Sequence, residues 1–140
     1  QGVMRLALIT QSYLVNDDTK CVRIRSWEEG DKTECYLTIK SCEPGSTRTE
    51  VEVPISVDQY RALDALADKG TIIKRRFIVQ NLGDEWEIDV FDDGLVIAEI
   101  EFVNEGSSEM FVTPDWLGKE VTDNKAYHNA EIAKMKYPKP

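Results

Sequence analysis

The 140-residue chain is 41% hydrophobic and 31% charged, which suits one compact domain with a single sizeable core. Its formal net charge of -9 disfavours nucleic acid and anionic membranes as partners. No run reaches the roughly 18 to 20 apolar residues of a membrane span, and three cysteines without C-x-x-C spacing fit neither a disulfide framework nor a zinc site. We expect a cytoplasmic domain over residues 1–137, followed by a frayed tail at 138–140.

Most of the sequence alternates between apolar and polar residues with a period of two, which predicts strands separated by turns rich in Gly, Asp and Asn. Connections this short join antiparallel neighbours. Strands are expected over residues 4–15, 20–27, 34–41, 48–55, 71–80, 85–92 and 95–103.

Two helices are predicted to interrupt the strands. Ser56 and Gln59 form a capping box, apolar residues follow at helical spacing, and Gly70 stands where a C-terminal cap would lie. A second helix is expected over residues 125–136, before Pro138. The fold class is therefore α+β, mainly antiparallel β.

Charged residues recur on the strands at positions i and i+2, so both members of each pair lie on one face of the sheet. Like charges about 7 Å apart repel by roughly 2 kcal/mol at an effective dielectric of 20. A ligand would relieve this repulsion, with phosphate oxygens against Arg and Lys and a divalent cation between carboxylates. The pairs are Arg23 with Arg25, Glu50 with Glu52, Lys74 with Arg76, Glu87 with Asp89, and Glu99 with Glu101, and Lys40 is a single charge on a further strand.

Two arrangements fit this alternation. The charged face is either an ordinary solvated surface or the lining of a cavity, and periodicity alone does not decide which face is inside. A cavity would turn the apolar face outward, and the predicted helices are too few to cover it. Missing elements or the partner in a homodimer would then cover that face.

Several short motifs follow one another in a specific order and spacing: Val22-Arg-Ile-Arg25, Tyr36-Leu-Thr-Ile-Lys40, Arg48-Thr-Glu-Val-Glu52, Lys74-Arg-Arg76, Trp86-Glu-Ile-Asp-Val-Phe91 and Ala98-Glu-Ile-Glu-Phe102. Together they resemble the CYTH superfamily of triphosphate tunnel metalloenzymes. This family includes class IV adenylyl cyclases, thiamine triphosphatases and inorganic triphosphatases. The resemblance implies an eight-stranded closed β-barrel with flanking helices, whose charged interior binds a triphosphate together with Mg or Mn.

The resemblance also implies roles by position. The expected phosphate-binding residues are Arg23, Arg25, Lys40, Lys74 and Arg76. The expected metal ligands are Glu99 and Glu101, followed by Glu87 and Asp89. Lys40, Glu50 and Glu52 are the expected catalytic residues. Glu50, Glu52, Glu87 and Asp89 have open alternatives, namely a second metal, a water-positioning base or support of the basic residues.

The resulting hypothesis is metal-dependent hydrolysis of inorganic triphosphate or a small organic triphosphate. Two alternatives stay open: a class IV adenylyl cyclase that converts ATP to cyclic AMP, and a non-catalytic polyphosphate- or nucleotide-binding module. The family usually begins with a strand carrying an E-x-E-x-K motif, and no such motif precedes Gln11. We therefore expect the first strand to be missing from this chain, which begins at Gln1.

Overall fold

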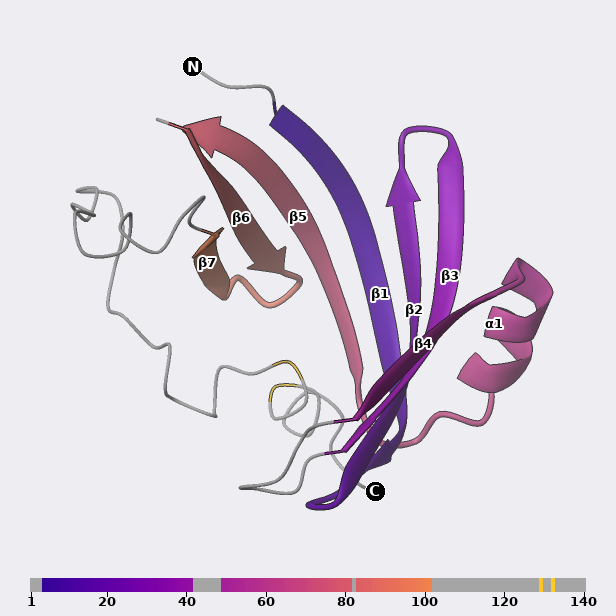
Figure 1. Ribbon diagram of the computed structural model, residues 1–140. Coiled ribbons are helices and arrows are strands. Elements are labelled where there is room, and N and C mark those ends of the chain that lie inside the picture. The colour runs from indigo at the N-terminus through magenta and orange to yellow at the C-terminus, as the bar shows by residue number, and fades with distance from the viewer. Residues whose placement is uncertain (1–3, 42–48, 82, 102–128, 130–131, 133–140) are drawn as a thin grey trace.

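The computed structural model describes residues 4–41, 49–81, 83–101, 129 and 132 (Figure 1). The elements in these ranges are β1 (Met4–Asn16), β2 (Lys20–Glu29), β3 (Lys32–Ser41), β4 (Glu50–Ile55), α1 (Val57–Asp64), β5 (Thr71–Asn81), β6 (Asp84–Phe91) and β7 (Val96–Glu101). Each predicted strand is confirmed, with ends that shift by a few residues. The second predicted helix and the tail fall mostly outside the described residues, although positions 129 and 132 are helical.

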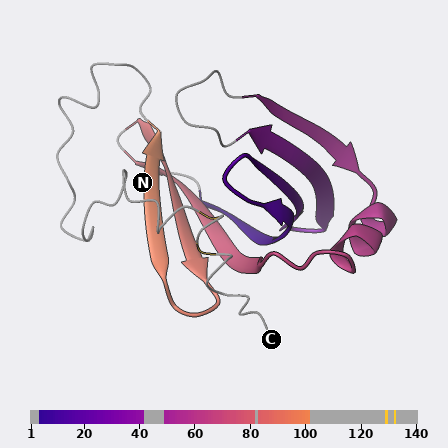
Figure 2. The same cartoon turned by 90° about the horizontal axis from the view of Figure 1, so that it is seen from below.

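The strands form one antiparallel sheet in the order β4-β3-β2-β1-β5-β6-β7, which curls strongly (Figure 2). The closed barrel is not confirmed, because in the described part of the chain β4 pairs only with β3 and β7 only with β6, so both are edge strands. The prediction of a missing first strand is wrong for this sheet. β1 lies at its centre and pairs with β2 and β5. Backbone pairing on both sides and the apolar run from Leu6 to Ile9 build this strand, and neither depends on an acidic motif.

Helix α1 packs on one face of the sheet, against β2 and β3. Its capping box is confirmed, since Gln59 N donates to Ser56 Oγ (3.0 Å) and Ser56 N donates to Gln59 Oε1 (2.8 Å). The cap predicted at Gly70 is wrong, because the helix ends at Asp64 and is capped by Ala65. Gly70 has φ +112°, and its carbonyl accepts a hydrogen bond from Tyr13 N where the chain turns into β5.

Polar side chains fasten α1 to the sheet. Ser12 Oγ donates to Asp64 Oδ1 (2.8 Å), and the Tyr60 hydroxyl donates to the Thr10 carbonyl (3.4 Å). Ile24, directly across from Ser12 in the β1–β2 pair, is fully buried. Other apolar side chains of this outer face stay exposed, including Leu6, Leu8, Ile39, Val51, Val53 and Ile73. The homodimer predicted to cover them stays a prediction.

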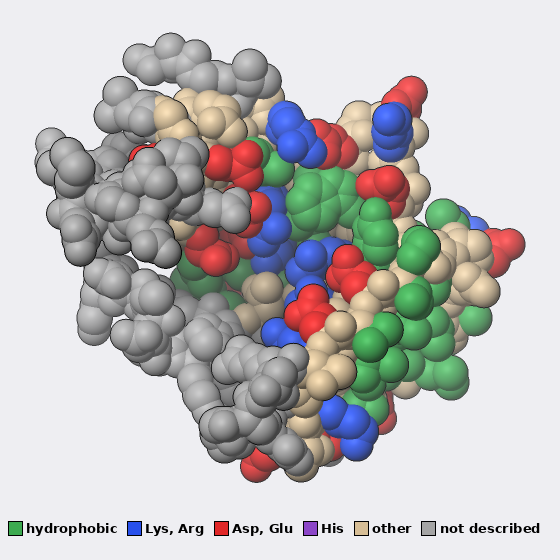
Figure 3. Space-filling model, in the orientation of Figure 1, with side chains coloured by type: hydrophobic (Ala, Val, Ile, Leu, Met, Phe, Trp, Pro, Cys, Tyr) green, Lys and Arg blue, Asp and Glu red, His purple; other side chains and the backbone are tan. Residues whose placement is uncertain are grey.

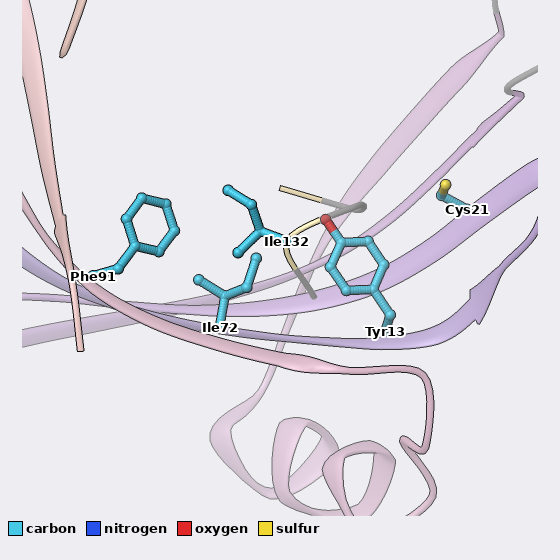
Figure 4. Packing of buried hydrophobic residues seen from close by; sticks show 5 residues of the cluster. All are labelled: Tyr13, Cys21, Ile72, Phe91 and Ile132. Atoms are coloured by element: carbon cyan, nitrogen blue, oxygen red, sulfur yellow. The ribbon is translucent and has the colours of Figure 1, made fainter. Parts of the chain in front are cut away.

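The opposite, inner face ends in an apolar cluster (Figure 4). It consists of Tyr13, Cys21, Ile72, Phe91 and Ile132. A register shift at Leu14 in the β1–β2 pair returns Asn16 to the inner face, where its side-chain oxygen accepts from Cys21 Sγ (3.5 Å). No helix among the described residues has the length and apolar character that a membrane crossing requires.

Burial predicts unequal costs for two isoleucines of the outer face. Ile24→Ala removes a side chain that is 0% exposed, so it should lower the free energy of unfolding by about 2–5 kcal/mol. Ile73→Ala is the matched control on β5, where the side chain is 41% exposed, and it should cost clearly less. Urea denaturation measures both. Equal losses would contradict the packing described for α1 and β2.

Candidate functional site

The inner face carries every charged residue that the sequence singled out. Strand register places Arg23 and Arg25 of β2 beside β1 and β3, and Lys74 and Arg76 of β5 beside β1 and β6. On this face β1 contributes Ala7, Ile9 and Gln11, all buried. The acidic residues flank this centre on β4, β6 and β7. Figure 3 looks onto this hollow face, where Lys and Arg side chains lie in the middle with Asp and Glu on both sides.

Arg23 and Arg25 carry positive charge that no carboxylate in the described residues pairs with. Arg25 Nε donates to the neutral Gln11 Oε1 (2.8 Å). The pKa of Arg25 is lowered to about 10, mainly by burial and in addition by the nearby charges of Arg23 and Arg76. Arg23 Nε is buried and has no hydrogen-bond partner among the described residues. An anion bound here would satisfy this donor and relieve the repulsion.

The two cations of β5 share one carboxylate. Asp89 accepts two hydrogen bonds from Arg76, from Nε to Oδ1 (2.8 Å) and from Nη2 to Oδ2 (2.9 Å). Lys74 Nζ lies 2.8 Å from the same Oδ2. Burial alone would raise the pKa of Asp89, but the bonds from Arg76 and Lys74 outweigh it and lower the pKa. Asp89 is therefore ionised, with both oxygens engaged by cations.

Lys74 is 1% exposed and has further contacts. Its Nζ donates to Asn129 Oδ1 (3.1 Å) and lies 5.2 Å from the centre of the Phe91 ring. Burial lowers the pKa of Lys74 to about 8 against the opposing charge of Asp89. Because the ammonium has lost most of its water, it would hold an anion more strongly than an exposed lysine would.

Glu87 and Glu99 are cross-strand neighbours on β6 and β7. Burial raises the pKa of Glu87, Arg76 opposes this rise, and Glu99 adds to it. Arg76 Nη1 lies 3.3 Å from Glu87 Oε1, whereas Glu99 is exposed. Glu101 pairs with Glu85 on the same face. The described residues contain no group of three acidic, His or Cys side chains arranged to hold a metal ion, so the predicted metal ligands stay a prediction.

The predicted catalytic residues lie on β3 and β4. Lys40 and Glu50 are cross-strand partners, but no ion pair joins their side chains in the described part of the chain. Thr38 Oγ1 donates to Glu52 Oε1 (2.8 Å) and fixes this carboxylate toward Arg25. Of these three residues, Glu52 lines the cavity of the inner face.

That cavity has a volume of about 330 Å³ and opens toward the end of the sheet opposite the apolar cluster. Its walls are Arg5, Arg25, Trp27, Glu29, Glu34, Tyr36 and Glu52. The sequence analysis singled out none of Arg5, Trp27 and Glu29 as site residues. The parity of β1 contains a signal for Arg5, since residues 5, 7, 9 and 11 share the inner face.

The depressed pKa of Lys74 predicts a pH-dependent contribution to stability. Between about pH 8 and 10.5 folded Lys74 has released a proton that the unfolded chain still holds, so stability rises with pH in this window. The free energy of unfolding of the wild type, minus that of Lys74→Met, should therefore increase from pH 8 to 10 in urea denaturation. Arg75→Met, which removes an exposed charge that does not titrate in this range, is the control and should give a flat difference. A flat difference for Lys74→Met would contradict the burial of a charged lysine.

Comparison with known proteins shows the family to which the chain belongs. No family model matches it. An inorganic triphosphatase of Acetivibrio thermocellus is 38% identical over 134 residues, which cover 93% of this chain and 82% of the relative. One of Nitrosomonas europaea is 32% identical over 136 residues, covering 94% and 87%. The crystal structure of the inorganic triphosphatase NE1496 matches with a TM-score of 0.71 and 27% identity, over 96% of this chain and 95% of that chain. The chain therefore belongs to the family of these inorganic triphosphatases, within the CYTH superfamily that its motifs resemble.

Proposed function

We propose that this protein hydrolyses inorganic triphosphate in the hollow of its sheet. One observation carries the proposal: Arg23 and Arg25 lie on the inner face without a carboxylate partner in the described residues. The names of the relatives point to the same substrate. A buried surplus of positive charge is costly without a ligand, and a triphosphate has the charge to offset it.

The basic residues have two different tasks in this proposal. Arg23 and Arg25 are free to form bidentate contacts with phosphate oxygens, for which the guanidinium geometry is suited. Lys74 and Arg76 are already oriented by Asp89, so they present fixed positive charge and lose little side-chain entropy on binding. Lys40 extends the basic surface along β3. We assign Asp89 to the support of Lys74 and Arg76, and not to a metal, because both of its oxygens are engaged.

A divalent cation fits the acidic side of the hollow. Magnesium is ordinarily held by one or two carboxylates together with substrate phosphates and water. Glu87 and Glu99 are neighbouring carboxylates; burial raises the pKa of Glu87 and repulsion from Glu99 adds to this rise, and a cation between them would remove that repulsion. Glu101 follows on the same face of β7. When bound, Mg or Mn would neutralise charge that develops on the phosphate oxygens.

Hydrolysis needs a water in line with the terminal phosphorus. The water oxygen forms a bond to phosphorus, the bond to the bridging oxygen breaks, and phosphate and pyrophosphate result. We assign Glu52 to the orientation of this water, because it faces the cavity and Thr38 fixes its carboxylate. Glu50 lies farther along the same edge strand, where it pairs in register with Lys40. The arginines and Lys74 then stabilise the charge of the transition state.

Phosphate release tests the proposal. The wild type should release phosphate from inorganic triphosphate with Mg or Mn and should stop in EDTA. Arg25→Ala should lower kcat/KM by about 10²-fold or more, since a buried contact to a charged group is lost. Arg75→Ala, on the exposed outer face, is the matched control and should keep wild-type activity.

Equal activity of Arg25→Ala and the wild type would contradict the proposed site. Cyclic AMP as the product from ATP, without turnover of inorganic triphosphate, would favour the cyclase alternative. Binding of triphosphate without any turnover would favour a binding module.

A further inference from the structure

Trp27 is held in one orientation at the opening of the cavity. Its indole Nε1 donates to Glu29 Oε1 (3.1 Å). Glu29 in turn receives two hydrogen bonds from Arg5, from Nε to Oε2 (2.7 Å) and from Nη2 to Oε1 (2.8 Å). A bidentate Arg–carboxylate pair fixes geometry as well as charge. The ring is therefore anchored from the solvent side.

The other side of the ring is anchored from the interior. The guanidinium carbon of Arg76 lies 5.7 Å from the centre of the Trp27 ring, within the range of a cation–π contact. Arg76 is itself fixed by its two bonds to Asp89. A continuous series of contacts thus runs from Arg5 at the rim to Asp89 inside, with Trp27 in the middle. A residue held in this way forms a wall, because moving it would break contacts on both sides.

The cavity that this wall bounds is small and charged. Its volume of about 330 Å³ lies at the low end of the roughly 300–1,000 Å³ of pockets that bind organic ligands. Such pockets are lined mainly by apolar side chains, whereas five of the seven lining residues here are charged. The three carboxylates of this lining outnumber its two guanidiniums, and apart from the rings of Trp27 and Tyr36 it offers little apolar surface to a base and ribose.

We propose that Trp27, held by Glu29 and Arg5, determines specificity by excluding triphosphates that carry a nucleoside. The proposal rests on the proposed function of the same hollow. Trp27 does not act on the reacting atoms. It limits the space next to Arg25 and Arg76, so that inorganic triphosphate enters and a nucleoside triphosphate meets the ring.

The test compares two substrates in two variants and a control. kcat/KM is measured for inorganic triphosphate and for ATP, and Kd for both is measured by calorimetry in EDTA. Trp27→Ala should raise the ratio of ATP to inorganic triphosphate by about 10-fold or more in both measurements. Glu29→Gln, which keeps the ring but weakens its anchor, should shift the ratio in the same direction by less. Glu28→Gln, an exposed carboxylate on the outer face, should leave the ratio unchanged.

Two results would overturn the proposal. A ratio that falls in Trp27→Ala would mean that the ring stacks on the base, and an unchanged ratio in both variants would mean that it does not limit the space. Circular dichroism checks that each variant is folded. If Trp27→Ala does not fold, the substrate ratio of Glu29→Gln tests the proposal. If the wild type binds inorganic triphosphate but does not hydrolyse it, only the proposed hydrolysis is contradicted. The Kd ratios still test whether Trp27 excludes nucleoside triphosphates.

Discussion

The carboxylate of Asp89 allows two buried cations to lie close together on the inner face of this sheet. Lys74 and Arg76 are nearly inaccessible to solvent, and two cations that close together would repel each other strongly without a counter-charge. Asp89 binds both of them through hydrogen bonds of 2.8 to 2.9 Å. Phe91 and Asn129 complete the surroundings of Lys74, and Trp27 packs on Arg76. Removing this carboxylate would leave the buried charge of Lys74 without an ion pair and Arg76 with Glu87 alone, which ordinarily costs several kcal/mol.

The positive charges of the inner face are paired with carboxylates to different extents on its two sides. The cations of β5 are paired with carboxylates of β6, whereas Arg23 and Arg25 of β2 face the neutral side chains of Tyr13 and Gln11 on β1 and form no ion pair in the described residues. The chain as a whole has a net charge of -9, so the positive charge in the hollow is local and is surrounded by an acidic exterior. A small polyanion that enters the hollow gains charge-assisted hydrogen bonds that it does not find elsewhere on the surface. The positive charge without a carboxylate partner therefore determines where a polyanion binds.

Strand alternation explains what could be read from the sequence. Arg23 with Arg25 and Lys74 with Arg76 were placed on one face correctly, because side-chain parity depends only on spacing within a strand. To predict that Asp89 pairs with both β5 cations, one must know the register between β5 and β6, which no local pattern encodes. The cap predicted at Gly70 is wrong because several residues after Asp64 still suit a helix, yet the chain leaves α1 earlier to reach β5. No local pattern identifies Glu29 as a site residue, because its partner, Arg5, is distant in sequence.

The absence of the acidic motif led to the wrong expectation that the first strand is missing. Residues 4 to 16 lack E-x-E-x-K, but they form the central strand by pairing with β2 and β5, and Ala7, Ile9 and Gln11 are its uncharged residues on the inner face. The basic charges of β2 and β5 therefore flank the uncharged residues of β1, and the acidic charges follow on β4, β6 and β7. The motif was informative about chemistry and uninformative about strand formation.

The most direct test of the uncompensated charge is a measurement of stability with and without the anion. Urea unfolding in EDTA would compare the wild type, Arg25→Met and Arg75→Met, each with and without inorganic triphosphate. Ligand that binds only the folded protein raises the free energy of unfolding. We expect this gain for the wild type and Arg75→Met and its loss in Arg25→Met, which should itself be no less stable than the wild type without ligand. An equal gain in all three proteins would contradict the account.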